Sequence, residues 1–222
     1  MDEILARRPS SSMSAVPLHV VTHPIAQDAL AELRNKDTTS AVFRAAAHRL
    51  SVVVIAEALR DLPATPTQIV TPVGPSAGHT LRGDIVLVPV LRAGLGMLDA
   101  ALLLVPRARV GHIGLRRDEE TAVASRYYAR LPEHVHDSSL VVLDPMLATG
   151  GSAAAAFDLV KSAGARRVRL ICLVAAPEGV AALERAHPDV AIYTPAVDSH
   201  LNDRKFIVPG LGDFGDRLYG TE

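Results

Sequence analysis

The sequence predicts an α/β protein whose core is a mostly parallel β-sheet flanked by helices. From Asp84 onward, short apolar runs rich in β-branched residues alternate with segments of helical periodicity. Strands that are buried on both faces of a parallel sheet read as such nearly continuous apolar runs. A chain of 222 residues, 49% of them hydrophobic, is also large enough to bury one substantial core. We therefore expect one main domain.

The residues before Asp84 predict a tail followed by two helices. Residues 1–18 contain two early acids, paired arginines and several serines, and they lack the apolar stretch of a secretory signal, so we expect a flexible tail. Residues 25–35 and 41–61 carry apolar positions at helical spacing. Thr38, Thr39 and Ser40 offer N-cap chemistry for the second helix.

Residues 84–194 predict strands joined by crossover helices. We expect strands at 84–90, 109–115, 139–144, 166–175 and 190–194, with helices at 94–105, 151–164 and 178–187. The single cysteine, Cys172, lies within one of these apolar runs, so we interpret it as a small buried hydrophobic residue. Two segments, 116–137 and 195–222, depart from the alternation; we expect functional loops there because both contain aromatic and apolar residues.

A glycine-containing loop follows the strand expected at 139–144. The stretch "DPMLATGGS" begins at Asp144, contains Gly150 and Gly151, and leads into a helix. In open α/β sheets ligands bind at the carboxyl ends of the strands, where helix N-termini attract phosphate. Asp144 would repel phosphate itself and is better suited to accept hydrogen bonds from neighbouring sugar hydroxyls, so the loop indicates a ribose phosphate. The alternative is a plain strand-to-helix turn capped by Ser152.

A second loop, "VPVLRAGLGM", places Arg92 and two glycines at the same sheet edge. Arginine at a glycine-rich turn suits bidentate contact with a diphosphate, although a surface salt bridge is the alternative. Other phosphate motifs do not fit, because the chain has no Gly-Lys dipeptide of a Walker A loop, and Asp99 stands where a dinucleotide fingerprint needs its third glycine.

These segments resemble the uracil phosphoribosyltransferases, a branch of the type I phosphoribosyltransferases. The resemblance rests on four segments that occur in the family's order, "VPVLRAGLGM", "VVLDPMLATGGSA", "VAAPEGVAALERAHPDV" and "FIVPGLGDFGDRLYGT". It extends from about His19 to the C-terminus. It implies the type I phosphoribosyltransferase fold, with a small hood formed by N-terminal and C-terminal segments. Residues 19–222 would form a single domain, in which 195–222 contribute the base-binding hood.

The resemblance implies the transfer of a phosphoribosyl group from 5-phosphoribosyl 1-diphosphate to uracil, giving UMP and diphosphate, a step of pyrimidine salvage. Magnesium would bind chiefly through the phosphates of the substrate. The residues implied to bind 5-phosphoribosyl 1-diphosphate are Arg92, Arg117, Asp144, Pro145, Met146, Leu147, Ala148, Thr149, Gly150, Gly151, Ser152 and Asp213. Those implied to bind uracil, largely through main-chain groups, are Ile207, Gly212, Asp213 and Phe214. No residue is implied to act as a nucleophile.

Net charge and the length of apolar runs limit the kinds of partner that the chain can bind. The formal net charge is −1 and basic residues are scattered, so we expect no nucleic-acid partner, and no apolar run approaches the ~20 residues of a membrane span. We expect a cytoplasmic homodimer or homotetramer, the family's habit, and leave activation by GTP open. Two alternatives stay open: a regulatory protein that keeps this fold and binds nucleic acid, and an enzyme for another base.

Overall fold

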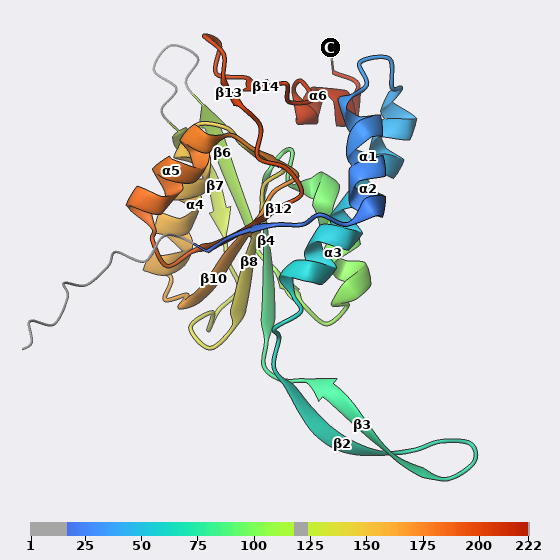
Figure 1. Ribbon diagram of the computed structural model, residues 1–222. Helices are drawn as coiled ribbons and strands as arrows, with labels where there is room; N and C mark the ends of the chain where they lie inside the picture. The colour runs from blue at the N-terminus through green and yellow to red at the C-terminus, as the bar shows by residue number, and fades with distance from the viewer. Residues whose placement is uncertain (1–16, 118–123, 222) are drawn as a thin grey trace, which may run out of the picture.

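The computed structural model describes residues 17–117 and 124–221, with the backbone alone at Arg117 and Ala124. Its centre is a twisted sheet flanked by helices on both faces (Figure 1). The strand order is β1, β12, β10, β8, β4, β6, β7, and β5 also pairs with β4. The strands are β1 (Leu18–Val20), β4 (Ile85–Leu91), β5 (Arg109–Val110), β6 (His112–Arg117), β7 (Ala124–Arg130), β8 (Ser139–Leu143), β10 (Arg167–Ile171) and β12 (Ala191–Thr194).

All neighbouring strands of this sheet run parallel except β6 and β7, which are antiparallel. The predicted fold class is therefore confirmed. Helices α1 (Pro24–Arg34), α2 (Ser40–Ala58) and α3 (Leu95–Leu104) cover one face, and α4 (Gly151–Ser162) and α5 (Pro177–Ala186) cover the other (Figure 1).

The sheet separates two apolar cores. Along β4, Leu87 faces a core that contains Phe43 of α2, whereas Val88 faces a core that contains Phe157 of α4. This alternation explains why the strand is apolar at every position, as expected for a strand covered on both faces. Cys172 has no exposed surface in the second core, and burial raises the pKa of its thiol to about 12.

Short elements lie above the carboxyl ends of the parallel strands. The described part of the hood, 195–221, contains β13 (His200–Leu201), β14 (Ile207–Val208) and α6 (Phe214–Tyr219). In Figure 1, α6 lies beside α1, whereas β13 lies on the side of α5. A separate short pair is formed by β9 (Met146–Leu147) and β11 (Val174–Ala175), which run parallel. The Glu178 carboxylate of α5 accepts the Leu201 N–H at 2.9 Å, which lowers the pKa of that carboxyl and joins the hood to α5.

The structure adds elements that the sequence did not predict. Strands β2 (Ala64–Val70) and β3 (Pro75–Leu81) form an antiparallel hairpin that projects away from the body (Figure 1). Within 116–137, expected as a loop, β6 reaches Arg117 and β7 begins at Ala124, while 118–123 lie outside the described residues. β1 begins at Leu18, one residue before the expected start of the domain.

Helix boundaries agree closely with the expected ones, with one difference in capping. Thr39 is the N-cap of α2, but its side chain makes no capping hydrogen bond. Thr38 instead donates its hydroxyl to the Glu32 carbonyl of α1 at 2.7 Å. Across residues 17–117 and 124–221, no helix combines the length and apolar character needed to cross a membrane.

Candidate active site

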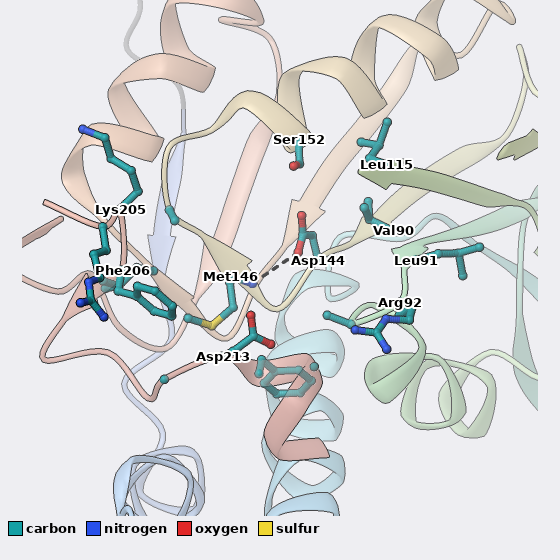
Figure 2. A pocket seen from close by; sticks show the side chains of 17 residues that line it. Val90, Leu91, Arg92, Leu115, Asp144, Met146, Ser152, Lys205, Phe206 and Asp213 are labelled. Carbon is teal, nitrogen blue, oxygen red and sulfur yellow. Dashed lines mark hydrogen bonds between the residues drawn. The ribbon is translucent and has the colours of Figure 1, made fainter. Parts of the chain in front are cut away.

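A cavity of about 340 Å³ lies between the sheet edge and the hood. That volume is typical of small-molecule sites. Three segments that are distant in sequence converge on it: the end of β4, the loop after β8, and the hood (Figure 2). The lining residues are Val90, Leu91, Arg92, Ala93, Leu115, Asp144, Met146, Ala148, Ser152, Arg204, Lys205, Phe206, Ile207, Gly212, Asp213, Phe214 and Gly215.

The loop 144–152, termed the phosphate loop below, is fixed by β11 and α5. The Pro145 carbonyl accepts the N–H groups of Leu173 and Val174 at 2.9 and 3.1 Å, and the Leu147 carbonyl accepts the Ala176 N–H at 2.8 Å. Pro145 and Leu147 are buried and do not line the cavity. Their contribution is to hold the loop in place.

Two glycines allow α5 to pack directly against the phosphate loop. A Cβ at Gly179 would lie 2.4 Å from the Ala148 carbonyl oxygen and 2.6 Å from that of Leu147. Gly150 has a φ of +81°, and a Cβ there would lie 2.9 Å from the Gly179 carbonyl oxygen. Both positions therefore exclude larger residues. Gly150 is also the N-cap of α4, so Ser152 lies in the first turn of the helix instead of capping it.

Asp144 and Asp213 bring two carboxylates to the cavity from segments that are distant in sequence, the loop after β8 and the hood. Asp144 directly follows β8, and its Oδ1 accepts the Met146 N–H at 3.4 Å. Asp213 is the N-cap of α6, where its Oδ1 accepts the Asp216 N–H at 3.0 Å. Figure 2 shows both carboxylates and Arg92 arranged around the same space.

The loop after β4 presents Arg92. Its side chain is 64% exposed, and its guanidinium lies 3.7 Å from the Asp216 carboxylate, a loose ion pair. Its carbonyl accepts the Tyr219 hydroxyl at 3.3 Å, which connects this loop to α6. Gly94 makes the turn possible, because a Cβ there would lie 2.3 Å from the Leu143 carbonyl oxygen of β8.

Phe214 lies at the cavity, but its ring is buried in the apolar core. The ring is 1% exposed and packs edge-on against Phe43, with centroids 5.3 Å apart, inside the core of α2 and α3. Ile207, Gly212 and Asp213, the other residues expected at the base, also line the cavity.

Sequence reasoning missed part of the lining. Arg204, Lys205 and Phe206 form the turn between β13 and β14, and Lys205 has a φ of +64°. Phe206 lies beside Met146 on the hood side of the cavity (Figure 2). Their position directly before Ile207, an expected base-binding residue, is the one sequence feature that could have indicated them. Among the expected residues, Thr149, Gly150 and Gly151 lie in the phosphate loop but do not line the cavity, and the side chain of Arg117 lies outside the described residues.

A family model described as uracil phosphoribosyltransferase matches residues 20–221. The chain belongs to the uracil phosphoribosyltransferase family. A protein named uracil phosphoribosyltransferase in Alkaliphilus oremlandii is 50% identical over 204 residues, which cover 91% of this chain and 98% of that one. One of the same name in Streptococcus sanguinis is 50% identical over 206 residues, covering 92% and 99%.

A solved structure also resembles this chain throughout. A protein from Aquifex aeolicus has a TM-score of 0.88 and 38% identity, over 92% of this chain and 99% of that one. As a member of the uracil phosphoribosyltransferase family, the chain is a transferase.

Proposed function

We propose that the cavity is the place where this enzyme transfers the phosphoribosyl group of 5-phosphoribosyl 1-diphosphate to uracil, giving UMP and diphosphate. The observation that carries the proposal is the convergence of the Arg92 loop, the phosphate loop and the hood on one cavity. Each segment presents the chemistry needed by a different part of the two substrates.

The phosphate loop would hold the ribose 5-phosphate and the ribose hydroxyls. Residues Thr149–Ser152 lie at the start of α4, where the helix dipole favours an anion. Asp144 would accept hydrogen bonds from the ribose hydroxyls. Pro145 and Leu147, which are buried, would act by fixing the loop through their carbonyls.

Arginines would stabilise the leaving diphosphate. Breaking the bond from ribose C1 to diphosphate develops negative charge on the leaving group and positive charge on the sugar, so cations are needed on one side and carboxylates on the other. Arg92 lies at the cavity, and Arg117 ends β6, the strand next to β4. Asp144 and Asp213 would face the sugar.

The hood would bind uracil through the main chain of Ile207, Gly212, Asp213 and Phe214. Uracil presents an N3–H donor next to an O4 acceptor, and one backbone C=O with one N–H can meet both. Cytosine reverses both groups, and two unmatched buried polar pairs should lower kcat/KM by on the order of 10² to 10⁴.

The donor set also fits magnesium. Mg²⁺ prefers oxygen ligands and is commonly bound through one or two carboxylates together with substrate phosphates. Asp144 and Asp213 supply such oxygens at the cavity. When bound, the ion would neutralise charge on the diphosphate.

The direct test is an activity assay with 5-phosphoribosyl 1-diphosphate, magnesium and, in turn, uracil, cytosine, hypoxanthine and orotate. We expect UMP formation and a preference for uracil over cytosine of at least 10². A preference below tenfold would refute readout of uracil by the main chain of the hood.

The same proposal includes a homodimer or homotetramer. The hairpin β2–β3 exposes apolar side chains at its tip, with Val70 86% and Val73 98% exposed. A second copy would cover these side chains.

A further inference from the structure

The peptide groups of Gly210 are held on both sides by a single ion pair. The Asp198 Oδ2 accepts the Gly210 N–H at 2.8 Å, and the Arg34 Nη1 donates to the Gly210 carbonyl, also at 2.8 Å. Arg34 and Asp198 bind each other through two further hydrogen bonds, of 2.8 and 2.6 Å. Three segments far apart in sequence therefore meet at one residue of the hood.

This arrangement is built into the fold. The side chain of Asp198 is 5% exposed and that of Arg34 is 25% exposed. Removing water from two charges is costly unless the geometry is bidentate and further hydrogen bonds are made. Here the pair is bidentate, and Arg34 Nη1 and Asp198 Oδ2 each make a further bond to Gly210. The pair serves a particular backbone conformation, because Gly210 has a φ of +59° and a Cβ there would lie 2.2 Å from the Ile207 carbonyl oxygen.

A second arginine holds the next residue. Arg217 of α6 donates to the Leu211 carbonyl at 2.7 Å and to the Asn35 carbonyl, just after α1, at 2.6 Å. Its guanidinium lies 4.5 Å from the ring centroid of Phe43. Gly210 and Leu211 belong to the four-residue stretch 208–211, which joins Ile207 to Gly212, and both of these end residues line the cavity. The turn that carries the lining is thus fixed from α1 and from α6.

We propose that Arg34 and Asp198 are positioning residues of the base site, which set the affinity for the base and the discrimination between uracil and cytosine without touching the substrate. The inference rests on the proposed function, in which main-chain groups of Ile207 and Gly212 read the base. Such readout discriminates only while the backbone cannot shift, and a displacement of about 1 Å can cost on the order of 10²-fold in rate.

The test compares Asp198→Ala, Asp198→Asn and Arg34→Lys with the unchanged enzyme. For Asp198→Ala we expect the KM for uracil to rise roughly tenfold or more, the KM for 5-phosphoribosyl 1-diphosphate to change less than about threefold, and the uracil-to-cytosine ratio of kcat/KM to fall. Asp198→Asn keeps an acceptor for the Gly210 N–H, so its effect should be smaller.

The matched control is Arg169→Ala. Arg169 is 15% exposed, binds Asp61 and the Ala58 carbonyl, and does not line the cavity. This variant should unfold more easily yet keep the uracil KM and the base ratio. UMP binding measured by calorimetry gives a second readout, weakened in Asp198→Ala and unchanged in the control.

The outcomes separate this inference from the proposed function. If the unchanged enzyme preferred another base, the proposed function would fail, and the variants would be scored with that base. Folded Asp198 and Arg34 variants with unchanged base KM, base ratio and UMP binding would overturn the inference. If Asp198→Ala did not fold, Asp198→Asn and Arg34→Lys would decide it by the same criteria.

Discussion

At the scale of single residues, Asp144 joins the end of a buried strand to the cavity. Its neighbour Leu143 has no exposed surface, whereas Asp144 itself is half-buried and lines the cavity. A carboxylate in this place can accept hydrogen bonds from sugar hydroxyls more strongly than a neutral amide of the same shape.

Asp144→Asn should therefore raise the KM for 5-phosphoribosyl 1-diphosphate by roughly 10- to 100-fold, the scale of one hydrogen bond to a charged group. The melting temperature should barely change, because the amide is nearly isosteric. Steady-state kinetics and thermal unfolding measure both quantities. A variant with full activity and a clearly lower melting temperature would show that Asp144 is structural.

We expect substitution of Phe214 to change the stability of the protein but not its choice of base. Since its ring is buried and packs on Phe43 in the core, Phe214→Ala should lower the free energy of unfolding by about 3 to 5 kcal/mol. The preference between 5-fluorouracil and 5-iodouracil should stay unchanged. Urea unfolding and competition kinetics test the two halves, with Phe214→Leu as the milder variant. A changed preference at pyrimidine C5 would place the ring in the base site.

Arg92 and Arg117 should matter for turnover more than for folding. Arg92 is largely exposed and its ion pair with Asp216 is loose, so Arg92→Ala should change the free energy of unfolding by less than about 0.5 kcal/mol. Its kcat should fall roughly 10²-fold or more, the scale for losing one charge-stabilising donor. We expect the same kinetic loss for Arg117→Ala. Unchanged kinetics in either variant would remove that arginine from the site.

At the scale of elements, the phosphate loop depends on the close packing of α5. Gly179→Ala would place a methyl group against the carbonyls of Leu147 and Ala148, so the loop or the helix must move. We expect a loss of about 1 to 3 kcal/mol in the free energy of unfolding. The KM for 5-phosphoribosyl 1-diphosphate should rise roughly tenfold or more.

The control for this substitution is Gly74→Ala in the hairpin turn, where a Cβ would meet nothing within 4 Å. It should leave both the unfolding free energy and the KM for 5-phosphoribosyl 1-diphosphate unchanged. A Gly179→Ala variant that behaved like Gly74→Ala would mean that the phosphate loop tolerates displacement.

The elements that could be predicted from sequence are those whose buried faces produce a recognisable pattern of apolar residues. Helix α2, expected at 41–61, spans Ser40–Ala58, and β4, expected at 84–90, spans Ile85–Leu91. The hairpin β2–β3 leaves no such pattern, because neither of its faces is buried and Pro66, Pro75 and Gly78 weaken the strand signal.

The candidate site was predictable where one segment carries a whole motif. The phosphate loop and residues 207–214 are continuous stretches, and the expected residues Asp144, Ser152 and Gly212 do line the cavity. Arg34 and Asp198 could not be found in this way, because 164 positions separate them and only the tertiary fold brings them to Gly210. The same holds for the packing of Phe214 on Phe43.

At the scale of the whole molecule, the hairpin β2–β3 projects away from the body (Figure 1). If it joins two copies, Val70→Asp together with Val73→Asp should reduce the molar mass in light scattering, because charges would enter an apolar contact. The subunit itself should stay folded, since these side chains are exposed.

The control is Leu103→Asp on α3, which changes a side chain that is 65% exposed on another surface. It should leave the molar mass unchanged. An unaltered mass in the double hairpin variant would exclude the hairpin tip from the assembly.

The burial of Cys172 has a practical consequence for such measurements. Maleimide dyes react with thiolates, and a thiol without exposed surface whose pKa is about 12 presents almost none at neutral pH. Since this is the one cysteine of the chain, we expect the unchanged protein to take up almost no dye. A cysteine introduced in place of Leu103, which lies outside the proposed contact, would then carry the only fluorophore, and energy transfer between labelled copies could follow assembly in real time.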